Sequence, residues 1–174
     1  MKSNEKVIAV VVTNQIELDK VPSEYTGQVI INGGSRENPI VVKQRYKRTP
    51  KAVAQSFVLV KGRGELIASD EATIIAYHYT KIKAYDFVTV YAWHQATVTA
   101  HGNCKVIAKN SVKITAFGNC KVQLWDMTKA KARGYVEVLN FGKSKSYLWQ
   151  NSKAWIMSDT AHAFELEATA RVIR

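Results

Sequence analysis

The sequence predicts an all-β fold, a parallel β-helix (β-solenoid) built from eight-residue strand–turn units with an N-terminal β cap. Three observations support this. The chain repeats every eight residues from about Ser56, apolar and polar residues alternate within each repeat, and Gly or Asn recurs at its end. A unit this short cannot bury a core alone, so successive units must stack.

The repeat is clearest between Ala72 and Asp159, where successive octads read ATIIAYHY, TKIKAYDF, VTVYAWHQ, ATVTAHGN, CKVIAKNS and onward. The two preceding octads, SFVLVKGR and GELIASDE, also fit, whereas the segment TPKAVAQS (49–56) does not. After Asp159 the length persists but the consensus fades, as is common in the terminal units of solenoids. We therefore expect the solenoid to span residues 56–174, within a single compact domain.

Positions one, three and five of the octad are small or β-branched, and position five is mostly Ala. Because side chains of a strand alternate between its two faces, these positions are expected to face inward and positions two, four and six outward. Ala at position five indicates a narrow interior. Positions seven and eight are rich in Gly and Asn, which tolerate the positive φ of a sharp turn.

The number of octads in each coil can be two or three. The string GNCKV recurs after 16 residues, which favours two strands per coil. A 24-residue coil instead gathers basic residues on one side, and on this ground we predict three strands per coil. The residues gathered are Lys81, Lys83, Lys105, Lys109, Lys129, Lys131, Arg133 and Lys153. The pattern does not determine the handedness.

Residues 1–55 lack the octad and are predicted to form a β cap over the open end of the solenoid. Strand-like runs cover Val7–Val12, Gln28–Ile31 and Pro39–Val42. A basic loop follows at 43–51, with five basic residues among nine and one Tyr. Its residues Arg45, Lys47 and Arg48 either bind phosphates or belong to a solvated linker.

The chain has 25 Lys and Arg against 14 Asp and Glu, a net charge of +11. This excess favours an anionic partner, and we expect nucleic acid, with RNA favoured, or a nucleic-acid-binding protein complex. Lys could also serve only to keep an exposed sheet soluble. Aromatic residues at position six could stack on bases or on one another. Those expected to contact the partner are Tyr85, Trp93, Trp125 and Trp149.

The sequence gives little support for an enzyme. Outward carboxylates are few and scattered, the four His share no metal-ligand spacing, and phosphate-loop and nucleophile-elbow motifs are missing. We therefore expect no catalytic residue, metal or cofactor. No apolar run approaches the ~20 residues that cross a bilayer, so we expect a cytoplasmic protein without membrane contact, as a monomer or small homo-oligomer. The alternative is a protein-interaction or assembly scaffold that uses the aromatic corners.

The pattern V-x-A-x-x-x-A/C-x-V-x-A, found in Thr89–Ala100 and Val106–Ala116, resembles the octapeptide-repeat parallel β-helix proteins of bacteria and their phages. The resemblance covers about two thirds of the chain and implies a fold, but no catalytic residues. The chain departs from that pattern in its Lys-rich side, its cap, and Leu124, Asn140 and Leu148 at position five. Its profile also resembles the phage inhibitors of host RNA-guided defence nucleases (anti-CRISPR-like), which implies action in a host cytoplasm.

Overall fold

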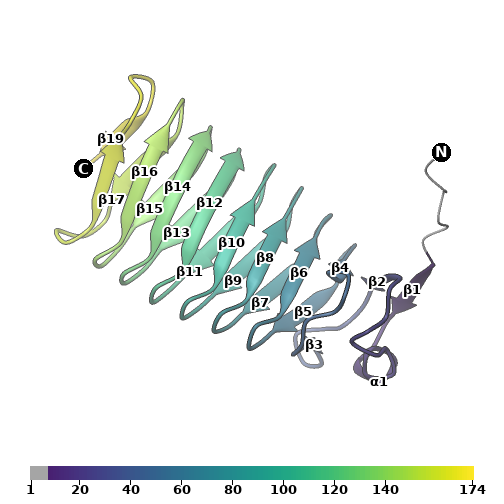
Figure 1. Ribbon diagram of the computed structural model, residues 1–174. Coiled ribbons are helices and arrows are strands. Elements are labelled where there is room, and N and C mark those ends of the chain that lie inside the picture. Colours follow the sequence, from purple (N-terminus) through teal and green to yellow (C-terminus); the bar gives the residue numbers. More distant parts are fainter. Residues whose placement is uncertain (1–7) are drawn as a thin grey trace.

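The computed structural model describes residues 8–174 and shows a parallel β-solenoid of two sheets that face each other along its whole length (Figure 1). The first, sheet A, has ten strands in the order β1-β2-β4-β6-β8-β10-β12-β14-β16-β18, and the second, sheet B, has nine in the order β19-β17-β15-β13-β11-β9-β7-β5-β3. From β2 onward, successive strands alternate between the two sheets. The fold class predicted from the octads is confirmed.

The strands are short, and most have four residues. Sheet A consists of β1 (Ala9–Val12), β2 (Gln28–Ile31), β4 (Lys51–Ala52), β6 (Glu65–Ala68), β8 (Lys81–Ala84), β10 (Thr97–Ala100), β12 (Lys113–Gly118), β14 (Lys129–Gly134), β16 (Lys145–Trp149) and β18 (His162–Glu165). Sheet B consists of β3 (Ile40–Val42), β5 (Phe57–Val60), β7 (Thr73–Ala76), β9 (Thr89–Ala92), β11 (Lys105–Ala108), β13 (Lys121–Leu124), β15 (Glu137–Asn140), β17 (Lys153–Ile156) and β19 (Arg171–Ile173).

Each coil contains two strands, so the prediction of three strands per coil is wrong. The strand register shows this directly, because Lys105 pairs with Lys121 and Thr97 pairs with Lys113, each 16 residues further along. The repeated GNCKV string indicated the correct period. The charge argument failed because Lys occurs at outward positions of both sheets, so clustering at one trial period did not identify a face.

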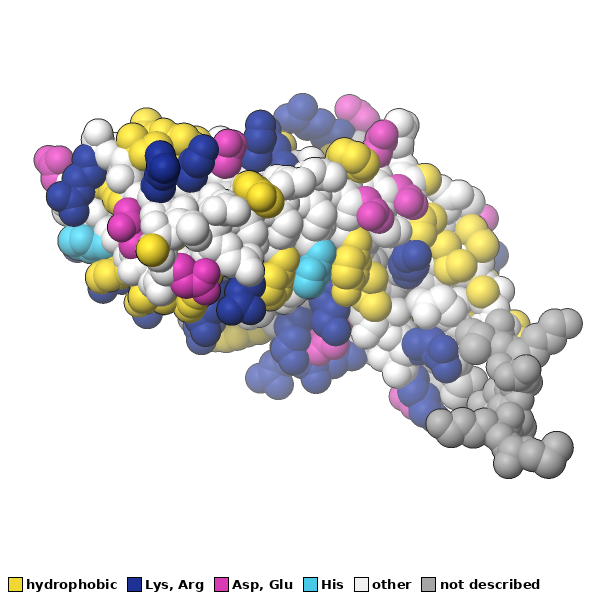
Figure 2. Space-filling model, turned by 90° about the horizontal axis from the view of Figure 1, so that it is seen from above, with side chains coloured by type: hydrophobic (Ala, Val, Ile, Leu, Met, Phe, Trp, Pro, Cys, Tyr) yellow, Lys and Arg dark blue, Asp and Glu magenta, His cyan; other side chains and the backbone are white. Residues whose placement is uncertain are grey.

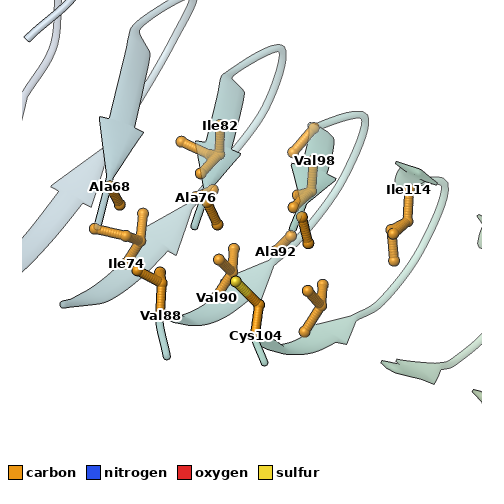
Figure 3. Packing of buried hydrophobic residues seen from close by; sticks show 14 of the residues in the cluster. Ala68, Ile74, Ala76, Ile82, Val88, Val90, Ala92, Val98, Cys104 and Ile114 are labelled. Carbon is orange, nitrogen blue, oxygen red and sulfur yellow. The ribbon is translucent and has the colours of Figure 1, made fainter. Parts of the chain in front are cut away.

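The core lies between the sheets and is filled by positions one, three and five, as predicted. Figure 3 shows Ile74 and Val90 from sheet B and Ile82 and Val98 from sheet A pointing into the same interior. These four side chains are at most 1% exposed. Ala76, Ala84, Ala92 and Ala100 at position five are fully buried, and the small side chain lets the sheets approach closely.

One buried polar cluster interrupts this apolar interior near the C-terminal end. The side-chain amide of Asn140, at position five of β15, donates to Ser146 Oγ at 2.9 Å, and Ser144 Oγ donates to Asn140 Oδ1 at 3.3 Å. All three residues are fully buried. Mutual hydrogen bonding explains how Asn140 at position five and Ser146 at position three are accommodated, since these positions are apolar in most other coils.

The turns between sheets bend at position seven of the octad, where the backbone enters the left-handed region. Gly102, Gly118, Gly134 and Gly142 have positive φ there, as do the non-glycine residues Asp70, His78, Asp86, His94, Asn110, Asp126 and Gln150. At Gly118 an added Cβ would lie 2.9 Å from the carbonyl oxygen of Gly102 in the coil below. At Gly118, close stacking on the turn below therefore requires glycine, whereas other turns accept a non-glycine residue at the same octad position.

The first described segment extends both sheets. β2 and β3 agree with the strands predicted at Gln28–Ile31 and Pro39–Val42, and β1 agrees with Val7–Val12 except for Val7, which lies outside the described residues. The exclusion of residues 49–56 from the stack is wrong. Within that segment β4 pairs with β6, Lys51 with Ile67 and Ala52 with Ala68. Pro50 is buried at position three of this octad. Because proline lacks a backbone N–H and is unusual within a sheet, the sequence pattern did not indicate a strand here.

A short helix, α1 (Gln15–Asp19), was not predicted and lies against the edge strand β3. Asn14 caps it by accepting from the N–H of Glu17 at 3.0 Å, and Glu17 accepts from the N–H of Thr13. The side chain of Gln15 accepts from the N–H of Val41 at 2.6 Å and so occupies part of the open edge of sheet B. Among residues 8–174, no helix is long and apolar enough to span a bilayer.

Candidate nucleic-acid interface

The outer face of sheet A is strongly basic. Between β8 and β16 its outward side chains include seven basic residues, all exposed, and no carboxylate. These residues are Lys81, Lys83, Lys113, Lys129, Lys131, Arg133 and Lys145, and we call them the sheet A basic face. In Figure 2 the molecule is seen along one row of turns, and blue Lys and Arg side chains lie along its two flanks.

Three of these lysines form a continuous column. The register places Lys113 beside Lys129 and Lys129 beside Lys145 on consecutive strands of sheet A. Neighbouring strands are about 4.8 Å apart, so the column sets three like charges at that interval. Lys131 stands two residues along β14 on the same face, and Arg133 two residues further. The outer face of β14 thus carries three cations.

The predicted basic site is divided by the two-strand coil. Sheet A carries five of the eight residues, Lys81, Lys83, Lys129, Lys131 and Arg133. The other three belong to sheet B: Lys105 lies on β11, Lys109 directly follows β11, and Lys153 lies on β17. The prediction that all eight share one side is therefore wrong. Lys113 and Lys145 were left out of the predicted site because the 24-residue coil was preferred, although the alternative 16-residue period groups them with Lys129.

The basic loop meets sheet A at its N-terminal end. Glu65 on β6 pairs with Arg45 at 3.2 Å and with Lys81 at 3.3 Å, and Arg45 also donates to the carbonyl oxygen of Arg63. Among residues 8–174, no other ion pair of these side-chain types is found within 4.0 Å. The cations from Lys113 to Lys145 thus lack carboxylate neighbours within the described chain.

The remaining loop residues differ in their surroundings. Lys47 and Arg48 are exposed, and the backbone N–H of Lys47 donates to the carbonyl oxygen of Ser23. Tyr46 packs against the hydrophobic core, where burial raises the pKa of its hydroxyl. The tyrosine of this loop is therefore a structural anchor, and the loop offers cations without a free aromatic ring.

Most position-six aromatics stack on one another between coils. On sheet B, Tyr77 stacks on Trp93 with ring centroids 4.9 Å apart, and Trp125 stacks on Phe141 at 4.1 Å. Lys109 lies over the Trp125 ring at 5.4 Å. These contacts occupy Trp93 and Trp125, two of the four aromatic residues predicted to contact a partner, and they stabilise the stack.

On sheet A the equivalent ladder is incomplete. Tyr85 stacks on His101 at 5.2 Å, and His101 stacks on Phe117 at 4.7 Å. The next rung is Arg133, and the one after it is Trp149. Within the described chain Trp149 has no aromatic neighbour in stacking contact. Its position is thus unlike those of Tyr85, Trp93 and Trp125.

The outer face of sheet B has a different character. Its central column, at position four, is largely apolar and half-buried, and the residues are Leu59, Ile75, Tyr91, Ile107, Leu139 and Trp155. A hollow of about 710 Å³ lies over this column between Lys105, Lys121, Leu139 and Trp155. Lysines border the apolar column, and Glu137 pairs in register with both Lys121 and Lys153.

The two cysteines are packed inside the stack and do not form a disulfide. Cys104 and Cys120 are fully buried at position one of adjacent coils of sheet B. Each thiol donates to a carbonyl oxygen three residues earlier, at 3.1 Å in both cases. A hydrogen bond with Cys120 and burial hold the pKa of the Cys104 thiol well above its ordinary value. Both cysteines are structural core residues.

The geometry defines the class as a two-sided parallel β-solenoid with one basic and one mainly apolar outer face. Among residues 8–174, no group of three or more His, Cys, Asp or Glu side chains is placed to hold a metal ion. Comparisons with protein-family models, with curated proteins and with solved structures find no significant match for this chain.

Proposed function

We propose that this chain is a non-enzymatic binding protein that engages nucleic acid, RNA in preference to DNA, through the sheet A basic face. One observation carries the proposal: Lys113, Lys129 and Lys145 lie side by side on consecutive strands, without a carboxylate near them. Like charges held opposite each other across strands destabilise a sheet. Binding of a polyanion would neutralise these charges and remove their mutual repulsion.

A phosphate backbone matches the shape and charge of this face. From β8 to β16 the face is four strand spacings long, about 19 Å, and its strands are parallel and in register. Lysines and arginines that neutralise phosphates release condensed counterions, which supplies much of the affinity of such complexes. Thr97, Thr99 and Thr115 lie among the cations and provide hydroxyl groups that can bond to phosphate or ribose.

Arg45 and Lys81 extend the face toward the N-terminal end. Glu65 forms an ion pair with both side chains and holds them beside sheet A. Its negative charge reduces the net charge of this group of three residues to +1. We assign them a supporting role and place the centre of binding on β12, β14 and β16. Lys105, Lys109 and Lys153 point away from this surface, since they belong to sheet B.

We further propose that the nucleic acid can be part of a ribonucleoprotein. The resemblance of the chain's profile to phage inhibitors of RNA-guided defence nucleases supports this partner class, and it rests on that resemblance alone. In such a complex the basic face would contact the guide RNA.

The test compares two matched triple variants by fluorescence anisotropy with a labelled 20-nucleotide RNA at low salt. Lys113→Thr/Lys129→Thr/Lys145→Thr removes the sheet A column, and Lys105→Thr/Lys121→Thr/Lys153→Thr removes three lysines from position two of sheet B. Thr already occupies position two at Thr97 and Thr89, so both variants suit the fold. The first variant should lose at least tenfold in affinity and the second little. Equal losses in the two variants, or no loss in the first, contradict the proposal.

A second candidate function is favoured by the apolar column of sheet B. Half-buried Ile107, Leu139 and Trp155 beside the hollow of about 710 Å³ offer a surface of the kind that protein partners bind. Binding through this face would depend weakly on salt. It would be lost in Trp155→Ala and retained in the sheet A triple variant, the reverse of the pattern expected for nucleic acid.

A further inference from the structure

The column of stacked aromatic residues on sheet A is interrupted at one strand, β14. Tyr85, His101 and Phe117 stack in sequence with ring centroids 5.2 and 4.7 Å apart, and Trp149 continues the same column two strands beyond Phe117. Arg133 occupies the rung between them. Its side chain is exposed, whereas Phe117 and Trp149 are half-buried.

A hollow marks this place on the surface. It measures about 220 Å³ and is bounded by the rings of Phe117 and Trp149, with Thr115, Lys131 and Arg133 also lining it. Ligand pockets for drug-sized molecules measure about 300–1,000 Å³, so this hollow suits a single ring system. Two aromatic walls and two cations select a flat ligand that carries negative charge.

The spacing of the strands limits how many rings can enter. Phe117 and Trp149 stand two strand spacings apart, about 9.6 Å. One nucleobase between them needs two stacking distances of ~3.4 Å, about 6.8 Å, whereas two bases need about 10.2 Å. This slot therefore admits one base and not two, and it exceeds the length filled by one base stacked on both rings by about 2.8 Å.

The free ring faces agree with this reading. Phe117 stacks on His101 on one side only, and the described residues supply Trp149 with no stacked ring at all. On sheet B, Tyr77–Trp93 and Trp125–Phe141 stack on adjacent strands, and exposed Lys109 stands between Trp93 and Trp125 with its ammonium group over the Trp125 ring at 5.4 Å. Arg133 separates Phe117 and Trp149 in the same way, but among residues 8–174 a cation is found over a ring only at Trp125, so the ring faces of Phe117 and Trp149 beside Arg133 are free.

From these contacts we infer that Phe117 and Trp149 hold one unpaired nucleobase between their rings, while Arg133 and Lys131 bind the phosphates next to it. This inference rests on the proposed function and narrows its ligand to single-stranded nucleic acid. Bases of a duplex are already stacked and paired, so a duplex can use the lysine column but not the slot. A single strand exposes the faces of its bases, and stacking on an aromatic side chain is tolerant of sequence.

The experiment measures anisotropy with a 12-nucleotide single-stranded RNA and with a 12-base-pair RNA duplex. Trp149→Ala should weaken single-strand binding about 5- to 150-fold and leave duplex binding unchanged, since each stacked base contributes on that scale. Trp149→Phe keeps a ring and should restore most of the affinity. The matched control is Trp155→Ala, another half-buried outward Trp near the C-terminal end but on sheet B, and it should have no effect.

Circular dichroism and a melting curve for each variant separate loss of binding from loss of folding. Equal weakening of single-strand and duplex binding in Trp149→Ala, or no rescue by Trp149→Phe, overturns the slot. So does an unchanged affinity in Trp149→Ala, even if the sheet A lysine variant loses binding, in which case the proposed function stands without the slot. Absence of binding to both RNAs by the unaltered protein refutes both proposals.

Discussion

Lys129 and Lys145 are direct neighbours in the parallel register of β14 and β16, and both are exposed on the same face of sheet A. Lys113 stands on the other side of Lys129. Because the chains are held about 4.8 Å apart by the sheet, these ammonium groups repel each other in the free protein. The column therefore lowers the stability of the fold, and under our proposal a bound polyanion neutralises it.

Replacing the central lysine should stabilise the free protein. Lys129→Thr relieves repulsion on both sides and should raise the melting temperature by up to about 4 °C at low salt. The gain should shrink in 0.5 M NaCl, where charges on the surface are screened. The control is Lys153→Thr, because Lys153 lies between Glu137 and Arg171 in register, so its removal loses one attraction and one repulsion and should leave the melting temperature nearly unchanged. A lower melting temperature for Lys129→Thr would show that the column is not repulsive.

The polar cluster in the core should contribute to stability as a unit. Ser146→Ala matches Ala130 and Ala163, its neighbours in the register, but leaves the Asn140 amide without its partner. We expect a loss of about 1–3 kcal/mol in the free energy of unfolding, measured by urea denaturation. Asn140→Ala in the Ser146→Ala background should then cost less than Asn140→Ala alone. Additive effects would mean that the two side chains do not interact.

The turn at Gly118 should not accept a side chain. Gly118 has a φ of +77°, and an added Cβ would meet the carbonyl oxygen of Gly102 at 2.9 Å. Gly118→Ala should therefore destabilise the protein by more than the ~1–2 kcal/mol that the left-handed conformation costs alone. Thr115→Ala, on the outer face of the same strand, is the control and should change little. Calorimetry of both variants checks this, and equal melting temperatures would contradict the turn geometry.

The buried thiols should be protected in the native state. Because the pKa of Cys104 is held above its ordinary value, its thiol stays protonated in the folded protein while it ionises in the unfolded chain. The folded state then binds more protons, so this thiol should make stability fall as the pH rises above about 8.5.

Titration with a thiol-reactive disulfide at pH 8 should detect no free thiol until denaturant is added, and then both. Cys104→Ala, which matches Ala72 and Ala96 at position one of other coils, should reduce the loss of stability at high pH. Rapid labelling of the native protein would place these cysteines outside the core.

The octads predicted the fold class because its determinants are local. Alternation of Val106 and Ala108 with outward Lys105, and glycine at Gly118, follow from the geometry of one strand and one turn. The number of strands per coil depends instead on how far each turn bends the chain, and residue types do not encode that angle simply. For this reason Lys105 and Lys129 were placed together although they lie on opposite sheets.

The candidate site was predicted in part. Lys129, Lys131 and Arg133 follow one another along β14 and remain together under any coil size. Lys113 and Lys145 join them only through pairing between strands, so the preference for a 24-residue period left both out of the predicted site. The gap between Phe117 and Trp149 was also hidden, since an arginine at position six is notable only when its two neighbours in the stack are known to be rings.

The salt dependence of RNA binding tests the central claim most directly. The logarithm of the association constant for a single-stranded RNA should fall linearly with the logarithm of salt concentration, and removing Lys113, Lys129 and Lys145 should reduce the slope by about 2, roughly 0.7 for each lost phosphate contact. The sheet B triple variant should keep the slope of the unaltered protein. The same slope in the sheet A triple variant and the unaltered protein would contradict the account, because the lysine column would then release no counterions on binding.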